Sequence, residues 1–227
     1  MTLESLTGDA GRDRKRTPGA RHSVRHGPRP EAGPEARPPA GVLLAAGAGR
    51  RLGRPKALLE LAGERLVDRG VRMLGDAGCA PIMVVVGAAQ VEVVGAVVVP
   101  NPDWRDGMGS SLRAGLAALP PGCPAAVVAL VDQPGIPAAA VARLVAAYEA
   151  GARIAVATYG GAPRNPVLLR AAHFADAARA AVGDTGARGF LRARPDLVTP
   201  VPCDDIAVPD DIDTPEDLAA FRAAHPG

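Results

Sequence analysis

The chain has 227 residues, a length that allows one large domain or two small ones. Hydrophobic residues make up 48% of it but aromatic residues only 3%, so Ala and Val must fill most of any core. The net charge of +2 gives no indication of a nucleic-acid-binding surface, and the apolar runs are too short to span a membrane.

The cysteines lie far apart in the sequence, at Cys79, Cys123 and Cys203. Their odd number and the lack of a C-x-x-C pair argue against a disulfide framework and against a zinc site. The first forty residues also lack the apolar segment of a signal peptide. These features predict a cytoplasmic protein with reduced thiols.

Residues 1–40 differ in composition from the rest of the chain. They contain six prolines and carry eight Lys or Arg residues against five Asp or Glu residues, a local charge of +3. Such a segment buries too little apolar surface to offset the entropy lost on ordering. We expect residues 1–40 to be a disordered basic tail and residues 41–227 to form a single domain. A tail that binds a partner and a start codon assigned too early are the alternatives.

After residue 40, short apolar runs alternate with helical patterns. The runs predict strands at 42–46, 82–86, 96–99, 126–131 and 154–158. The apolar periodicity predicts helices at about 65–77, 110–119, 137–150 and 170–181. A final helix is expected to begin near Thr214, a good N-cap residue that precedes Pro215. This alternation predicts an α/β fold with a mostly parallel sheet, helices on both faces and ligands at the carboxyl ends of the strands.

The first predicted strand runs into a basic loop rich in glycine. Its glycines are Gly47, Gly49 and Gly53, and its basic residues are Arg50, Arg51, Arg54 and Lys56. Backbone amides approach an anion closely where no side chain intervenes, and basic side chains neutralise the charge of that anion. The loop therefore predicts a phosphate-binding site.

Two common glycine loops do not fit this spacing. A P-loop ends in Gly-Lys-Ser/Thr, whereas Gly53 is followed by Arg54 and Lys56 by Ala57. A dinucleotide-binding loop has its third glycine one residue earlier than Gly53, and an acidic residue at the end of the second strand, where residues 87–90 contain none. A nicotinamide or flavin site and a plain turn with solvated arginines remain as alternatives.

Residues 44–56 resemble, position by position, the nucleotidyltransferase signature L-A-A-G-x-G-x-R-x-G-x-x-K. Over about residues 41–222 the chain is similar to the MobA-like family, and within it most to the molybdenum cofactor cytidylyltransferases. The resemblance implies a three-layer, Rossmann-like fold of the nucleotidyltransferase (GT-A) type. The nucleotide-binding residues that it implies in this loop are Ala45, Ala46, Gly47, Ala48, Gly49, Arg51 and Lys56. The catalytic residues that it implies are Arg51, Lys56 and Asp132.

Glycines and serines in the segment 106–116 precede an amphipathic helix. On their own, Ser110 or Ser111 could simply cap this helix. The segment is similar to the family's G-M-G-x-S-L, which lies against the base and ribose of the nucleotide. The resemblance therefore adds Gly109 and Ser111 to the nucleotide-binding residues.

Carboxylates follow the strand at 126–131 and precede the final helix. Asp132 ends that strand at the same sheet edge as the glycine loop, and carboxylate oxygens suit Mg²⁺, although a turn or cap role is the alternative. Residues 130–134 and 211–218 resemble the family's L-x-D-x-P and D-I-D-T-P-E-D-L. The resemblance implies that Asp132 and Asp211 bind Mg²⁺, with Asp213 as the second choice for the latter.

Two later loops resemble the acceptor side of the family's site. Residues 164–167 align with G-H-P-V but differ at the first two positions, and residues 183–188 are similar to G-D-x-G-A-R. The resemblance implies acceptor contacts from Asn165, Asp184 and Arg188. The fork of an arginine suits a phosphorylated or pterin-bearing acceptor.

The function implied by the resemblance is Mg²⁺-dependent transfer of a nucleoside monophosphate from an NTP to a phosphorylated acceptor, with release of pyrophosphate. CTP is favoured over GTP as donor, molybdopterin is the expected acceptor, and a molybdoenzyme or its maturation factor is a further expected partner. Neither nucleic acid nor a membrane is expected to bind. Two other classes stay open: an NAD(P)- or flavin-dependent oxidoreductase, and a non-catalytic nucleotide- or cofactor-binding protein. The combination of Lys56, Asp132 and Asp211 argues against the latter.

Overall fold

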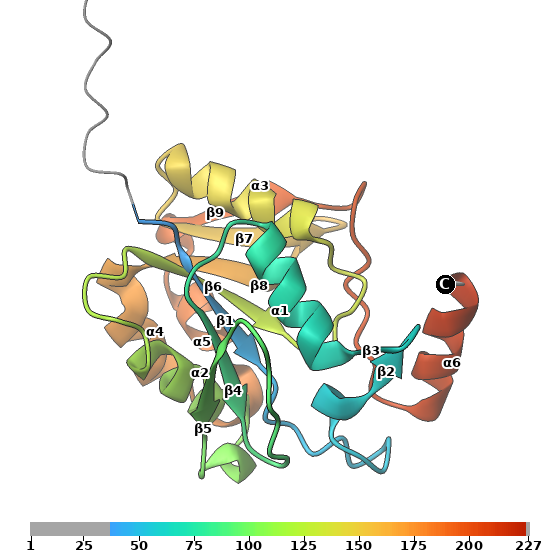
Figure 1. Cartoon of the computed structure of the whole chain (residues 1–227). Coiled ribbons are helices and arrows are strands. Elements are labelled where there is room, and N and C mark those ends of the chain that lie inside the picture. The colour runs from blue at the N-terminus through green and yellow to red at the C-terminus, as the bar shows by residue number, and fades with distance from the viewer. Residues whose placement is uncertain (1–36, 226–227) are drawn as a thin grey trace, which may run out of the picture. The chain divides into compact units, whose positions relative to one another are not determined.

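The computed structural model describes residues 37–225, and a seven-stranded sheet lies at its centre (Figure 1). Its strands are β1 (Ala40–Leu44), β4 (Ile82–Val86), β5 (Val97–Pro100), β6 (Ala125–Leu130), β7 (Ile154–Tyr159), β8 (Ala162–Arg170) and β9 (Val198–Pro202). They lie in the order β5-β4-β1-β6-β8-β7-β9. Neighbouring strands are parallel except that β8 runs antiparallel to both β6 and β7. Two short strands, β2 (Glu60–Leu61) and β3 (Glu64–Arg65), form a separate hairpin.

Helices cover both faces of the sheet. One face carries α1 (Leu66–Asp76) and α3 (Ala138–Glu149), and the other carries α2 (Met108–Ala117), α4 (Phe174–Ala180) and α5 (Arg188–Ala193). The last helix, α6 (Pro215–Ala224), lies beside the β2–β3 hairpin, where Arg222 donates to the carbonyl oxygen of Glu60 at 3.0 Å. Short 3-10 turns lie at Lys56–Leu58, Trp104–Asp106, Ala171–His173, Gly183–Thr185 and Pro195–Leu197.

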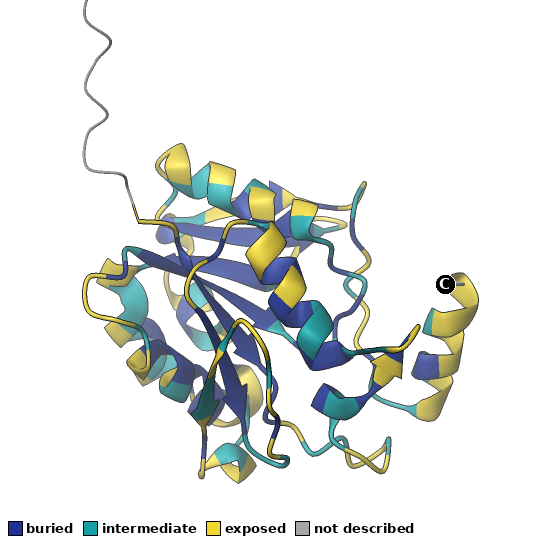
Figure 2. Ribbon diagram, viewed as in Figure 1, coloured by how far each residue is buried: buried dark blue, intermediate teal, exposed yellow. Residues whose placement is uncertain are grey.

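The central strand β1 is buried along its whole length, between β4 and β6 (Figure 2). Successive side chains of a strand point to opposite faces, so Leu43 belongs to the core under α1, and Val42 and Leu44 to the core under α2. A Cβ on Gly70 of α1 would lie 2.7 Å from a methyl carbon of Leu43, and a Cβ on Gly115 of α2 would lie 2.5 Å from one of Val42. Glycine therefore lets both helices approach β1 closely.

The predicted α/β fold with a mostly parallel sheet and helices on both faces is confirmed. All five predicted strands are present within two residues of their expected bounds. The final helix begins as expected. The Thr214 hydroxyl accepts from the amide of Asp217 at 3.2 Å, and the Asp217 carboxylate accepts from the amide of Thr214 at 2.8 Å.

The sequence patterns failed between residues 160 and 202. The helix expected at 170–181 begins only at Phe174, because β8 continues to Arg170, whose guanidinium donates to the carbonyls of Tyr148 and Ala152. Strand β8 escaped prediction because its first half is exposed, and two prolines interrupt its apolar pattern. Strand β9 is mostly exposed and also contains two prolines.

The body of the chain begins slightly before the predicted boundary at residue 41. Ala40 already starts β1, and the carbonyl of Pro39 accepts from the amide of Ala80 at 3.0 Å. The remainder of the predicted tail, residues 1–36, lies outside the described residues. Within residues 37–225, no helix is long and apolar enough to cross a membrane.

Candidate functional site

The glycine loop and Asp132 lie side by side because the two strands that carry them are neighbours. Leu44 ends β1 and pairs in parallel register with Leu130, which ends β6. The amide of Val131 donates to the carbonyl of Leu44 at 3.1 Å, so the pairing continues up to the residue before Asp132. The expectation that both segments share one edge of the sheet is confirmed.

Two of the loop glycines have different structural roles. Gly49 has φ 58°, and a Cβ there would lie 2.0 Å from the carbonyl oxygen of Arg54, so only glycine lets the loop fold back on itself. Gly47 has no atom within 4 Å of the position that a Cβ would take. It therefore leaves the start of the loop open to a ligand.

A compact ion cluster lies next to the loop. The ammonium of Lys56 contacts Asp132 Oδ2 at 2.6 Å and also forms an ion pair with Asp213. Arg51 contacts the other oxygen of Asp213 at 2.6 Å. The Lys56 side chain is only 14% exposed, so this cation is held between two carboxylates with little water around it. Residues 157 positions apart are thereby joined.

The charges in this cluster shift one another's proton affinities. Burial alone would lower the pKa of Lys56, but Asp132 and Asp213 raise it above its usual value. The hydrogen bond from Lys56 lowers the pKa of Asp213, and Arg51 adds to this effect. Lys56 is therefore charged at neutral pH, and Asp213 is ionised opposite it.

Asp211 is held in a different way. Gln133, a buried side chain, donates its amide to Asp211 Oδ1 at 2.8 Å. The amide of Ile212 donates to the carbonyl of Asp132 at 2.8 Å, so the acidic segment runs alongside the end of β6. Asp132, Asp211 and Asp213 thus converge on the loop edge as the sequence predicted, but only Asp132 and Asp213 share Lys56.

A pair of carboxylates suits a hard cation that takes its other ligands from water and phosphate. Within residues 37–225, no group of three or more His, Cys, Asp or Glu side chains is close enough to hold a metal ion. The carboxylates at this edge therefore fit Mg²⁺ only when the phosphate of a bound substrate supplies further ligands.

A cavity of about 350 Å³ opens beside the ion cluster, and we call it the phosphate cavity. Its lining residues are Leu44, Ala46, Gly47, Ala48, Arg50, Lys56, Trp104, Arg105, Gly107, Met108, Ser111, Leu130, Val131, Asp132 and Asp184. The predicted nucleotide-binding residues that line it are Ala46, Gly47, Ala48, Lys56 and Ser111.

Four other predicted residues do not line the phosphate cavity. Ala45 is buried, Gly49 closes the loop, and Arg51 is paired with Asp213. Gly109 serves packing, because a Cβ there would lie 2.6 Å from the carbonyl oxygen of Ala181. Ser111 reaches the cavity, but its buried hydroxyl also accepts from the amide of Asn101 at 3.0 Å.

Two further cationic residues line this cavity: Arg50, which was expected only as a basic residue of the phosphate-binding loop, and Arg105, which was not predicted. Arg50 belongs to the loop but occupies a variable position of its signature. Arg105 lies with its guanidinium carbon 4.6 Å from the centre of the Trp104 ring. Nothing in the local sequence of Arg105 indicated that it would face a loop some fifty residues earlier.

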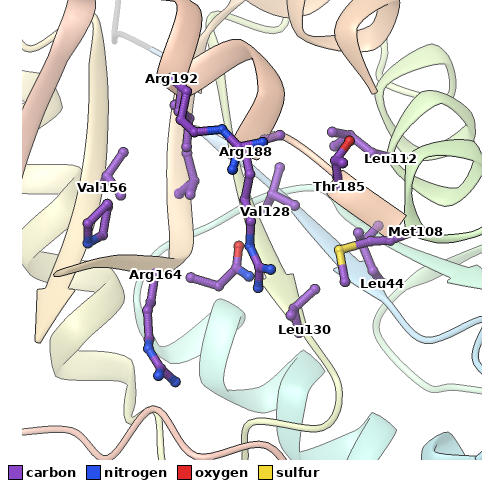
Figure 3. Close-up of a pocket in the computed structure, with 16 residues that line it drawn as sticks. Leu44, Met108, Leu112, Val128, Leu130, Val156, Arg164, Thr185, Arg188 and Arg192 are labelled. Atoms are coloured by element: carbon purple, nitrogen blue, oxygen red, sulfur yellow. The ribbon is translucent and has the colours of Figure 1, made fainter. Parts of the chain in front are cut away.

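A second cavity of about 200 Å³ lies against the same sheet edge, and we call it the arginine-rimmed cavity (Figure 3). Arg164, Asn165, Thr185, Arg188 and Arg192 form its polar rim. Its remaining lining residues are Leu44, Met108, Leu112, Val128, Leu130, Val156, Pro163, Val167, Gly186, Ala187 and Leu191. Leu44, Met108 and Leu130 line both cavities, so the two share a wall.

The predicted acceptor residues divide between the two cavities. Asn165 and Arg188 line the arginine-rimmed cavity, together with the unpredicted Arg164 and Arg192. Asp184 lines the phosphate cavity instead, and its carboxylate accepts from the amide of Met108 at the start of α2, at 3.3 Å. Arg192 could have been predicted, because it stands four residues after Arg188 on a helix.

Comparisons with known proteins identify a family and relatives of the chain. The MobA-like NTP transferase domain matches residues 41–198. The chain is 41% identical over 192 residues to nicotine blue oxidoreductase of Paenarthrobacter nicotinovorans. This alignment covers 78% of the chain and 93% of that protein. The chain is 40% identical over 105 residues to a probable molybdenum cofactor guanylyltransferase of Opitutus terrae, covering 44% of this chain and 50% of that protein.

A solved structure shares the fold. The complex of Rv0371c from Mycobacterium tuberculosis with manganese is 26% identical to the chain, with a TM-score of 0.69. The similarity covers 82% of this chain and 98% of that one.

Proposed function

Because the chain belongs to the MobA-like NTP transferase family, we propose that it moves a nucleoside monophosphate from an NTP to a phosphorylated acceptor and releases pyrophosphate. One observation carries this proposal: Lys56 joins the glycine loop to Asp132 and Asp213 at the rim of the phosphate cavity. A loop open to phosphate, a cation and two carboxylates are the parts that phosphoryl chemistry needs in one place.

The acceptor phosphate is already an anion, so its attack on the α-phosphorus needs no strong general base. The residues of the chain therefore act by positioning and charge. The open backbone at Gly47, with Arg50 and Lys56, holds the triphosphate. Lys56 leaves its two carboxylates when it turns to the phosphates, and this frees Asp132 and Asp213 for a divalent cation. Arg51 stays paired with Asp213 and offsets part of its negative charge.

We propose Mg²⁺ as that cation, held by Asp132 and Asp213. When bound, it would neutralise charge on the phosphates. The Asp132–Asp213 pair takes the place of the Asp132–Asp211 pair expected from the sequence, because Lys56 bridges the former and Gln133 holds Asp211. The manganese complex of the similar Rv0371c structure supports a divalent ion in this fold.

The donor and the acceptor are the finer parts of the proposal. We propose CTP as the donor, on the Ala45-Ala46-Gly47 sequence of the loop. The relative named a guanylyltransferase makes GTP the competitor. We propose molybdopterin as the acceptor, which the name of the same relative supports. The acceptor side of this chain differs from the family's pattern in having Arg164-Asn165 in place of Gly-His.

The experiment is a screen of the four NTPs with Mg²⁺ and phosphorylated acceptors, read as pyrophosphate release. We expect release that requires both an acceptor and a metal ion, and that is lost in Asp132→Asn. Pyrophosphate release by Asp132→Asn at the rate of the unmodified protein would contradict the mechanism. Its absence for every donor and acceptor would contradict the function.

One specific observation favours a second candidate, an oxidoreductase. The 41% identity to nicotine blue oxidoreductase spans nearly the whole of that protein. Against it, no carboxylate follows β4 to bind a ribose hydroxyl, since residues 87–90 are Gly, Ala, Ala and Gln. Calorimetry with CTP, GTP and NADPH separates the two. Tight NADPH binding that is indifferent to Lys56→Ala, without NTP binding, would favour the oxidoreductase.

A further inference from the structure

We propose that Asn101, which does not itself line the phosphate cavity, is a positioning residue for nucleotide recognition. It holds the hydroxyl of Ser111 so that the proton of this hydroxyl points into the phosphate cavity and donates a hydrogen bond to an acceptor atom of the base or ribose. The inference rests on the proposed function in taking an NTP as the occupant of this cavity.

Asn101 is a buried polar residue whose side-chain amide is fully engaged. It is 4% exposed and follows β5, and its backbone amide donates to the carbonyl of Val86 at the end of β4, at 2.8 Å. Its side-chain amide donates one hydrogen bond to Ser110 Oγ at 2.9 Å and another to Ser111 Oγ at 3.0 Å. Because both amide protons are used inside the protein, the Asn101 side chain is fixed in place.

The backbone amide of Asp103 determines which way round the Asn101 side chain lies. This amide donates to Asn101 Oδ1 at 3.0 Å. If the oxygen and the nitrogen of the side chain were exchanged, two donor groups would face each other and the hydrogen bond would be lost. Asn101 therefore presents donors, and not an acceptor, to the two serines.

The two serines differ in what remains free, although both are 4% exposed. Each hydroxyl has one proton, and each accepts a hydrogen bond from Asn101. Ser110 gives its proton to the carbonyl of Asp103 or of Gly107, at 2.8 and 2.9 Å, and it does not line the phosphate cavity. Ser111 does line this cavity, and among the described residues no acceptor takes its proton. The Ser111 hydroxyl therefore faces the cavity as a hydrogen-bond donor.

The position of Ser111 indicates which part of a nucleotide it contacts. Lys56 precedes Ala57, which belongs to the core under α1. Ser111 precedes Leu112, which belongs to the core under α2 on the other face. The two side chains therefore reach the cavity from opposite faces of the sheet. Because the triphosphate binds beside Lys56 in the proposed function, the base or ribose is the part that meets Ser111.

A donor fixed in this way contributes to selectivity. A buried donor that finds no acceptor on a ligand weakens the binding of that ligand, whereas a ligand with a lone pair at this point gains a hydrogen bond. Asn101 acts on the ligand only through Ser111, so the effects of the two residues on binding should be coupled.

The test measures binding without turnover, by calorimetric titration of the full chain. A second signal is the fluorescence of Trp104, the only tryptophan of the chain, which lines the phosphate cavity. The probes are CTP, GTP and inorganic tripolyphosphate, each with Mg²⁺. Tripolyphosphate keeps the phosphates but lacks the base and the ribose. The measured quantity is the affinity for the more tightly bound NTP divided by the affinity for tripolyphosphate, so an effect of a variant on phosphate binding cancels from this ratio.

The adjacent serines provide a matched pair of variants. We expect Ser111→Ala to lower the ratio about fivefold, because one hydrogen bond to the base or ribose is lost. Ser110→Ala removes the same hydroxyl from the same helix and the same partner, and it should leave the ratio unchanged. An equal loss in the two variants, or no loss in Ser111→Ala, would overturn the proposal.

Asn101→Asp tests the positioning role. An ionised carboxylate of nearly the same shape only accepts hydrogen bonds, so it draws the Ser111 proton away from the cavity. We expect the ratio to fall as in Ser111→Ala, and to fall no further when both changes are combined. Asn101→Leu adds no charge and, through the loss of the fixed orientation, should lower the ratio in part. An unchanged ratio in both Asn101 variants, or a further fall in the double variant, would overturn the proposal.

A fourth probe, ribose 5-triphosphate, assigns the acceptor atom. A loss in Ser111→Ala that is confined to the whole NTP places the acceptor on the base, and an equal loss for both probes places it on the ribose. The outcome is separable from that of the proposed function. NTP binding that depends on Asn101 and Ser111, in a protein that releases no pyrophosphate, keeps this inference and removes the transferase. Pyrophosphate release in a protein whose NTP binding is indifferent to both residues does the reverse.

Discussion

Lys56 holds two carboxylates together that would otherwise repel each other. Its ammonium lies between Asp132 and Asp213, the two carboxylates that we propose as metal ligands. We predict that Lys56→Ala raises the affinity for Mn²⁺ in the absence of nucleotide, on the order of tenfold, because the metal no longer displaces a buried cation. The same variant should bind NTP more weakly. Mn²⁺ binding is measured by electron paramagnetic resonance.

Arg54→Ala is the matched control for this prediction. It removes the same charge from the same loop, and within the described residues no carboxylate pairs with Arg54. Its Mn²⁺ affinity should equal that of the unmodified protein. A Lys56→Ala variant with unchanged or weaker Mn²⁺ affinity would mean that Asp132 and Asp213 form no metal site.

The three acids of the site should differ in importance. We predict that Asp132→Asn and Asp213→Asn each lower kcat about a hundredfold or more, because charge stabilisation in the transition state is lost. Asp211→Asn should cost less, because that side chain accepts from Gln133, whereas Lys56 pairs with Asp132 and Asp213. Steady-state pyrophosphate release gives kcat and KM for each variant. Asp205→Asn, whose carboxylate pairs with Arg143, is the control.

The opposite ranking of the three Asp→Asn variants by lost turnover would change the assignment of the second metal ligand. If Asp211→Asn lost as much turnover as Asp132→Asn while Asp213→Asn stayed active, Asp211 would be the second ligand, as the sequence alone suggested. The sequence located all three acids because they lie in motifs with fixed spacing. It could not rank them, because the contacts that distinguish them, from Lys56 to Asp213 and from Gln133 to Asp211, join residues far apart in the sequence.

Arginines were harder to predict than acids. Arg188 was found through a motif, but Arg164, Arg192 and Arg105 were not assigned to any site. A surface arginine has the same local pattern whether it pairs with a carboxylate or faces a cavity. Only the packing of β8 against β6 and of α5 against the sheet decides which occurs.

At the scale of elements, two glycines on helices offer opposite outcomes for the same substitution. A Cβ on Gly115 of α2 would lie 2.5 Å from Val42 and 3.0 Å from Val85, both on central strands. A Cβ on Gly75 of α1 would have Ile82 as its nearest neighbour, at 3.7 Å, which is an ordinary contact. We predict that Gly115→Ala destabilises the protein by about 1–2 kcal/mol through overpacking, and that Gly75→Ala stabilises it by about 0.5–1 kcal/mol.

Urea unfolding followed by circular dichroism measures both free energies. The pair is matched, since each variant adds one methyl group to a helix. A stabilised Gly115→Ala variant would show that α2 can shift away from β1 at no cost, and the close approach would not be needed for the fold.

The strands that the sequence predicted are those whose residues alone form a continuous apolar run. Strands β1, β4 and β6 are continuous apolar runs, buried on both faces. Strand β8 begins with four residues that are at least partly exposed, and it is recognisable only as the antiparallel partner between β6 and β7. Periodicity reports burial, so a strand that is half exposed and contains prolines gives no usable signal.

At the scale of the whole molecule, the cysteines report on the integrity of the core. Cys79, Cys123 and Cys203 are all buried, and burial raises the pKa of Cys79 to about 12. Because the thiolate is the reactive form, only about one in ten thousand Cys79 side chains is reactive at pH 8 even if a reagent could reach it.

We predict that the native protein fails to react with a thiol reagent at pH 8. In urea the three thiols should become reactive together, at the midpoint given by circular dichroism. This would show that the core under α1 and α3, which contains Cys79 and Cys203, unfolds as one unit. Fast reaction of one thiol in the native protein would instead reveal local opening near that cysteine, and mass spectrometry of the labelled peptides would identify it.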